Sequence, residues 1–180
     1  MDIIWHNKSK QFHLYNDKIS YIMGVSPVGE LENIYFGKRI HDKEDMSYVE
    51  IRIGLPGSVV DADTESYSKE LNLQEYPSFG TTDFGTQAYE IETANGSRIS
   101  SFTYKEHSIY KGKKSLNGLP ATYAAEDEAM TLEVRLEDEV AKAELTLFYT
   151  IFADYPVITR HATFTNIGTS SIKITRALSM

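Results

Sequence analysis

Apolar and polar residues alternate with a period of two along much of the chain, most clearly between Ala141 and Phe152. In that run one face would carry apolar side chains, and the other would carry Lys142, Glu144 and threonines. The residues before it alternate in the same way, and Glu137-Asp138-Glu139 lies between the two runs. This pattern predicts an antiparallel hairpin whose acidic turn lies in water. The apolar positions of the two runs are Leu132, Val134, Leu136, Ala141, Ala143, Leu145, Leu147, Tyr149 and Ile151.

A second hairpin is predicted at Asn95-Gly96, between Tyr89–Thr93 and Ser97–Tyr104. This dipeptide suits a type I′ turn, in which both central residues have positive φ. Other apolar runs, bounded by Asn, Asp, Gly, Pro and Ser, predict more short strands. These further strands are expected at Phe12–Tyr15, Ile19–Val25, Leu31–Phe36, Tyr48–Ile53, Val157–Asn166 and Ile172–Thr175.

Many short antiparallel strands, each with one apolar face, predict an all-β fold. Two sheets packed face to face would bury these faces in one core, so we expect an antiparallel β-sandwich. A closed barrel would also bury them, and the pattern alone does not separate the two folds. Three connections are longer than ordinary hairpin loops and are the expected places for a site: Arg39–Tyr48, Gly54–Phe84 and Lys105–Thr131.

Composition narrows the classes of partner. The chain has 180 residues, of which 41% are hydrophobic, and we expect residues 1–180 to form a single domain. The formal net charge of -8 argues against a nucleic-acid partner. No apolar run approaches the roughly 20 residues that span a bilayer as a helix, so no membrane partner is expected. The first residues lack the pattern of a secretory signal, and we expect a cytoplasmic protein.

Candidate chemistry within the chain is sparse. The five histidines are far apart in sequence, cysteine is absent, and neither a Gly-x-Ser-x-Gly motif nor a phosphate loop occurs. We therefore expect no catalytic residue, no metal site and no cofactor. Asp61 and Asp63 are candidates for substrate binding because alternate carboxylates of an extended segment can face one cation or sugar, although loop solvation also explains them. Among the aromatic residues, Tyr67, Tyr76 and Tyr110 are candidates for contact with a partner or a sugar.

Short blocks spread over the whole chain resemble, in order, the N-terminal domain of bacterial α-galactosidases of glycoside hydrolase family thirty-six. The blocks are Phe12-His13-Leu14, Ser20-Tyr21-Ile22, Tyr35-Phe36-Gly37-Lys38, Gln74-Glu75-Tyr76-Pro77, Thr82-Asp83-Phe84, Asn95-Gly96-Ser97, Tyr104-Lys105, Ile109-Tyr110-Lys111-Gly112-Lys113, Leu119-Pro120-Ala121-Thr122-Tyr123, Val157-Ile158-Thr159-Arg160 and Arg176-Ala177-Leu178-Ser179.

The resemblance implies a β-supersandwich like that of galactose mutarotase, placed before a (β/α)₈ barrel that holds two catalytic aspartates. In the family these residues hydrolyse terminal α-1,6-linked galactose of melibiose, raffinose and stachyose with retention, which needs two carboxyls about 5 Å apart. The chain would then be one domain of a longer glycoside hydrolase, inactive alone because both barrel aspartates are absent.

The implied partners are that catalytic barrel, other copies of the chain in a tetramer, and an α-galactoside oligosaccharide. Family members use loops of this domain to shape a neighbouring subunit's active site. Where relatives carry an aspartate and an arginine near the sugar, this chain has Ile53 and Glu65, and Gly85-Thr86-Gln87 replaces the usual Arg-x-Pro. We therefore assign no sugar contact there.

Three functions follow as alternatives. The first, favoured by the resemblance, is a non-catalytic domain for assembly and for shaping the active-site entrance of an α-galactosidase. The second is a free-standing carbohydrate-binding module, and the third is a β-sandwich used only for protein interaction.

Overall fold

A computed structural model describes residues 1–180 except 51–66, 70, 81–84, 117, 119 and 179–180. The described residues form ten strands and one short 3₁₀ turn, with no α-helix among them. No helix within this part of the chain is long and apolar enough to cross a membrane. The elements are β1 (Asp2–His6), β2 (Gln11–Tyr15), β3 (Ile19–Val25), β4 (Leu31–Lys38), η1 (Ser47–Val49), β5 (Tyr89–Thr93), β6 (Thr103–Lys111), β7 (Ala129–Asp138), β8 (Ala143–Phe152), β9 (Ile158–Asn166) and β10 (Ile172–Ala177).

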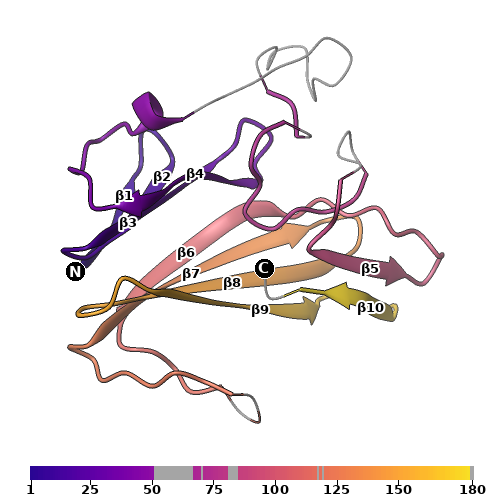
Figure 1. The fold of residues 1–180 in the computed structure, drawn as a ribbon. Helices are drawn as coiled ribbons and strands as arrows, with labels where there is room; N and C mark the ends of the chain where they lie inside the picture. Colours follow the sequence, from indigo (N-terminus) through magenta and orange to yellow (C-terminus); the bar gives the residue numbers. More distant parts are fainter. Residues whose placement is uncertain (51–66, 70, 81–84, 117, 119, 179–180) are drawn as a thin grey trace.

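Two four-stranded antiparallel sheets lie face to face (Figure 1). The first has the order β1-β2-β3-β4 and the second the order β6-β7-β8-β9, so neighbouring strands follow one another in sequence. A smaller sheet pairs β10 with β5 at one end of the second sheet. The predicted all-β class and antiparallel sandwich are therefore confirmed.

The core lies between the two large sheets because alternate residues of their strands point inward. The register pairs Phe12 with Met23, and Leu14 with Tyr21, so these four share the inner face of the first sheet. In the second sheet Leu145 lies opposite Leu136, and Leu147 opposite Val134. One cluster joins both faces and includes Ile3, Phe12, Leu14, Tyr21, Met23, Leu132, Val134, Leu136, Leu145, Leu147, Tyr149 and Ile151.

The hairpin predicted from the alternation is the β7–β8 pair, but its acidic turn differs from the prediction. Asp138 is buried, and its carboxylate accepts hydrogen bonds from the backbone N–H groups of Val140 and Ala141, each at 2.9 Å. Its other oxygen accepts a 2.8 Å bond from the Ser101 N–H. Asp138 is thus a structural residue of the turn, whereas the side chain of Glu139 is largely exposed.

The turn at Asn95-Gly96 forms, but the predicted pairing on either side of it is wrong. The Gly96 N–H donates to the Thr93 carbonyl at 2.8 Å. A type I′ turn would need positive φ at both Asn95 and Gly96, but of these two residues Gly96 alone has positive φ, at 83°. This is the geometry of a type I turn followed by a left-handed glycine rather than a type I′ turn. Strand β5 then pairs with β10, and no strand is formed by residues 97–102.

Two other expectations need correction. The connection expected at Lys105–Thr131 contains most of β6, which pairs with β7 along its length. The strand expected at Tyr48–Ile53 begins with residues of a 3₁₀ turn, and its second half, residues 51–53, lies outside the described residues.

Candidate functional site

A short segment at residues 73–75 extends the first sheet at the edge of β4. The Asn33 N–H donates to the Leu73 carbonyl at 2.7 Å, and the Glu75 N–H donates to the Leu31 carbonyl at 3.0 Å. Glu32 and Gln74 form a single antiparallel bridge between these two bonds. Because side chains alternate along an extended segment, this pairing turns Glu75 toward the space between the sheets.

The Glu75 carboxylate lies between the two sheets and accepts hydrogen bonds from both. Its Oε1 accepts from the Tyr21 hydroxyl of β3 at 2.6 Å and from the Asn33 amide of β4 at 2.8 Å. Its Oε2 accepts from the Tyr149 hydroxyl of β8 at 2.8 Å and lies 3.2 Å from the Arg160 guanidinium of β9. We call Glu75 and these four side chains the Glu75 cluster.

Arg160 binds the same segment a second time. Its guanidinium donates to the main-chain carbonyl of Glu75 at 2.7 Å and lies 5.0 Å from the centre of the Tyr149 ring. Burial, and then the negative charge of Glu75, raise the pKa values of Tyr21 and Tyr149 well above that of a free tyrosine. Both hydroxyls therefore keep their protons and donate at neutral pH. The cluster is satisfied on each carboxylate oxygen, as a buried charge requires.

Beside the Glu75 cluster a pocket of about 350 Å³ opens at the surface. Its wall combines Tyr21, Glu75 and Arg160 with the apolar side chains of Phe36, Leu73 and Ile158. Leu73 is 71% exposed and Phe36 is 59% exposed, which is unusual for large apolar side chains that lie together. We call Phe36, Leu73 and Ile158 the apolar rim.

This arrangement suits binding of an apolar surface better than acid–base catalysis. Each carboxylate oxygen of Glu75 already lies within hydrogen-bond distance of two donor groups, and the carboxylate is buried. Hydrolysis of a glycoside needs two carboxyls that can both reach the bond, and among the described residues that line this pocket Glu75 alone carries one. Within the described residues no group of three or more His, Asp or Glu side chains is arranged to hold a metal ion.

The segment continues from the cluster into an aromatic stack. Tyr76 lies parallel to Tyr89 with ring centres 5.3 Å apart, and its hydroxyl donates to the Leu178 carbonyl at 2.7 Å. The Leu178 N–H in turn donates to the Ala88 carbonyl at 2.7 Å. Residues 73–76 therefore connect both sheets, the small β5–β10 sheet and the residues that follow β10.

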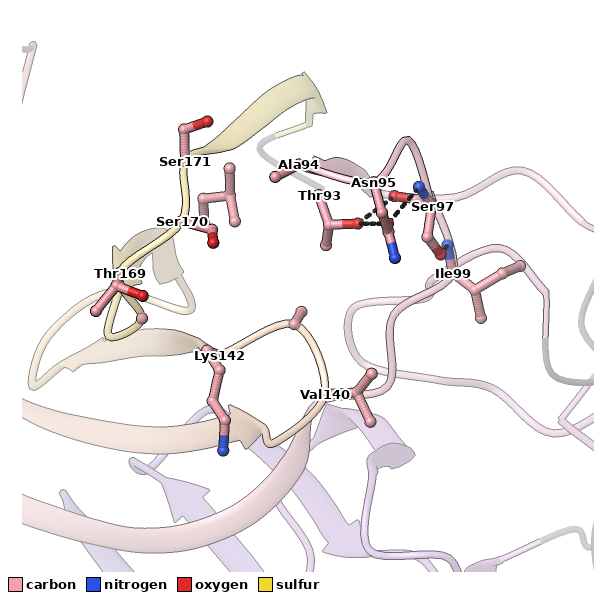
Figure 2. A pocket seen from close by; sticks show the side chains of 13 residues that line it. Thr93, Ala94, Asn95, Ser97, Ile99, Val140, Lys142, Thr169, Ser170 and Ser171 are labelled. Carbon is pink, nitrogen blue, oxygen red and sulfur yellow. Dashed lines mark hydrogen bonds between the residues drawn. The ribbon is translucent and has the colours of Figure 1, made fainter.

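A second pocket, of about 310 Å³, lies where three turns meet at one end of the sandwich (Figure 2). The turns are 93–97, 140–142 and 168–171, and most lining residues carry hydroxyl groups or small side chains. Asn95 accepts from the Thr93 hydroxyl at 2.6 Å and from the Ser97 N–H at 3.0 Å, so its oxygen serves the turn itself. The described residues that line this pocket include no aromatic side chain that could provide a flat surface for a sugar.

The residues predicted for a site have different outcomes. Asp61 and Asp63 lie outside the described residues, so their proposed role in substrate binding stays a prediction. Tyr67 is buried, which makes its prediction as a contact residue wrong in this structure. Tyr76 is half-buried at the edge of the aromatic stack, and the Tyr110 ring lies 4.5 Å from the Lys114 ammonium.

Sequence reasoning did not identify the Glu75 cluster as a unit. Glu75 and Arg160 are 85 positions apart, and only the fold brings their side chains together. Both residues belong to blocks that carry the family resemblance, and this shared membership was the sequence signal that could have pointed to them. The histidines, expected to be unrelated, include a pair: His6 and His13 both bind Asp42.

Comparison with known proteins gives a consistent family. The family described as "Glycosyl hydrolase family 36 N-terminal domain" matches residues 29–180. The chain is 41% identical over its whole length to the α-galactosidase AgaA of Geobacillus stearothermophilus, and covers 25% of that protein. It is 35% identical over 99% of its length to the α-galactosidase Mel36A of Lactobacillus acidophilus, again covering 25% of the relative.

Solved structures that superimpose on this chain come from the same family as the sequence relatives. The crystal structure of the GH36 α-galactosidase AgaB from Geobacillus stearothermophilus superimposes with a TM-score of 0.90 at 41% identity, covering 98% of this chain and 24% of that one. A variant of AgaA in complex with raffinose superimposes with a TM-score of 0.86 at 43% identity, covering 93% and 24%. The chain thus spans about a quarter of the length of these relatives, and it belongs to the family of glycosyl hydrolase family 36 N-terminal domains.

Proposed function

We propose that this chain is the single N-terminal domain of a longer α-galactosidase, and that it supports assembly of the enzyme and shapes the entrance to its active site. The observation that carries the proposal is the family match over residues 29–180, together with relatives named as α-galactosidases that are about four times as long. In such an enzyme the hydrolytic residues lie outside this domain, and the substrate is an α-galactoside of the raffinose and stachyose type.

The apolar rim supports a role in assembly. Exposed apolar side chains lie beside a buried polar cluster that fixes the backbone of residues 73–75, so their positions are held firmly. A preformed apolar surface loses little conformational entropy when it is covered by another protein surface. We propose that the catalytic barrel or another copy of the enzyme covers this surface in the complete protein, and that the complete protein is a homo-oligomer.

Assays of the isolated chain test the non-catalytic role. We expect no hydrolysis of raffinose by the 180-residue chain, because the reaction needs both a nucleophile and an acid, and the described lining of the pocket offers only Glu75, whose two oxygens already accept hydrogen bonds. We also expect no change in melting temperature on addition of galactose or raffinose, since a ligand that binds only the folded state would raise it.

Either positive result changes the conclusion. Raffinose hydrolysis by the isolated chain would place a complete active site within it and overturn the proposal. A saturable rise in melting temperature with galactose, and none with a sugar outside this class such as xylose, would instead favour the free-standing carbohydrate-binding module.

A further inference from the structure

A segment at residues 39–46, which we call the strap, follows β4 and crosses the outer face of the first sheet. Its backbone forms hydrogen bonds with side chains of β2, of β3 and of the turn between β1 and β2. The Ile40 N–H donates to the Ser20 hydroxyl at 3.0 Å, and the Met46 N–H donates to the Gln11 amide oxygen at 2.8 Å. The Glu44 carbonyl accepts from the Ser9 hydroxyl at 2.7 Å.

Two histidines of the sheet bind one carboxylate of the strap. His6 Nε2 lies 3.0 Å from Asp42 Oδ1, and His13 Nδ1 lies 2.6 Å from the same oxygen. The register of β1 and β2 pairs His6 with Gln11, and Ile4 with His13, which puts these side chains on the outer face. Beneath the strap His13 is fully buried and His6 nearly so.

The hydrogen bonds around His13 form a chain with one consistent direction. The Ser20 oxygen accepts from the Ile40 N–H, so its hydroxyl hydrogen is available to His13 Nε2, 2.9 Å away. His13 Nδ1–H then donates to Asp42, and the imidazole is neutral. The order serine, histidine, aspartate is that of a hydrolase triad, but Ser20 is fully buried and no substrate can reach it. These hydrogen bonds therefore have a structural role and hold the strap on the sheet.

Protonation of His13 reverses the direction of its hydrogen bond with Ser20. An imidazolium would carry a hydrogen on Nε2, so Ser20 would have to accept where it now donates, and its own hydrogen would lose its partner. The charged and titratable groups around His13 are Asp42, Arg39 and His6, with the Tyr15 ring 4.8 Å away and Glu44 near His6 at 3.5 Å. Arg39 and His6 disfavour a further positive charge, whereas Asp42 favours it.

Burial is the largest effect and lowers the pKa of His13 below that of a free histidine, although Asp42 acts in the opposite direction. Burial alone would raise the pKa of Asp42, but the hydrogen bonds from His13 and His6 lower it overall. Because the released His13 takes up a proton more readily than the fastened one, acid favours the released form.

We propose that the strap is a pH-sensitive element: protonation of His13 in mild acid opens its hydrogen bonds to Ser20 and Asp42 and releases residues 39–46 from the sheet. At neutral pH the strap is held, and it is released in a pH range below 6.5 while the sandwich stays folded. This inference rests on the geometry of the strap and is independent of the proposed function.

The test is hydrogen exchange of the 180-residue chain by NMR at pH 7.5, 6.5 and 5.5, with rates corrected for intrinsic exchange. Protection of the Ile40 and Met46 amides should fall by up to about tenfold per pH unit below 6.5, the limit for one linked proton. Amides of Leu145 and Tyr149 in β8 should keep their protection. Unchanged protection of Ile40, or equal loss in β8, would overturn the proposal.

A pair of variants separates His13 from other histidines. In His13→Gln the fall in Ile40 protection with acid should disappear, whereas in His161→Gln, which removes a ring stacked on Phe148 4.2 Å away, it should remain. If His13→Gln does not fold, titration of the His13 ring in the unmodified chain decides instead. Its midpoint must lie below 6.5 and coincide with the pH at which the strap-dependent protection of Ile40 reaches its floor, and a midpoint elsewhere contradicts the mechanism.

Discussion

Replacing Glu75 by glutamine should destabilise the domain more than its small change in shape suggests. The amide oxygen can still accept from Tyr21 and Asn33. The amide nitrogen, however, takes the place of the oxygen that now accepts from Tyr149 and pairs with Arg160. The Tyr149 hydroxyl can accept from that nitrogen only by turning its own hydrogen away from an acceptor, and the Arg160 guanidinium faces another donor. The guanidinium also loses its counter-charge while only 16% exposed.

The size of the effect follows from the burial of the pair. Removing one partner of a buried ion pair costs about 3–5 kcal/mol, and the remaining exposure of Arg160 favours the lower end, about 3 kcal/mol. For a domain of this size each 1 kcal/mol lowers the melting temperature by roughly 2–4 °C, so we expect a fall of about 6–12 °C.

The assay is reversible urea unfolding followed by circular dichroism, with Glu92→Gln as the matched control. Glu92 pairs with Arg98 at the surface, 2.7 Å away, and its loss should change stability little because water screens that pair. Equal stability of the two variants would refute the reasoning that the Glu75 cluster holds the sheets together. A second check is Tyr149→Phe, which should cost about 1.5–3 kcal/mol alone and less in the Glu75→Gln background.

Three further outcomes are expected. Leu132→Ala should cost about 2–5 kcal/mol in urea unfolding because Leu132 is fully buried, whereas Val140→Ala should change stability by less than about 0.5 kcal/mol because Val140 is 95% exposed. Stability should fall as the pH is lowered from 7 through 6.5, because burial lowers the pKa values of His13, His107 and His161 and the unfolded chain binds more protons than the native one; unfolding midpoints that rise toward pH 5.5 would contradict this sign. Leu73→Ser should reduce binding of a hydrophobic dye and self-association of the isolated chain without lowering its melting temperature, whereas Tyr123→Ser, at an exposed aromatic residue that is not among those lining the pocket of the apolar rim, should leave both unchanged.

The regular strands could be predicted because alternation is a local property. Apolar residues recur at every second position through most of β7 and β8, and ten residues of each pair in one register. Strand β6 was missed because its register shifts between Tyr104 and Glu106, which puts neighbouring polar residues out of step with the period of two. The second hairpin was predicted wrongly because a turn dipeptide determines the local turn, whereas the pairing of β5 with β10 depends on residues far away in the sequence.

The candidate site could be predicted only in part, because its contacts are long-range. Sequence indicated residues 74–77 as unusual and placed them in a connection expected to carry function. It could not show that edge pairing with β4 turns Glu75 inward, or that Arg160 meets it from β9. The strap shows the same limit: His6 and His13 are separated by seven positions and Asp42 by many more, yet all three meet on one face of the sheet.

The central claim, that this chain is the non-catalytic first domain of an α-galactosidase, is tested most directly by a fusion. The chain would replace the N-terminal quarter of AgaA from Geobacillus stearothermophilus, to which it is 41% identical, and α-galactosidase activity would be measured beside AgaA that lacks this quarter. The account predicts that the fusion is active and that the truncated protein has little or no activity. A folded fusion no more active than the truncated protein, or full activity in the truncated protein, would contradict the account.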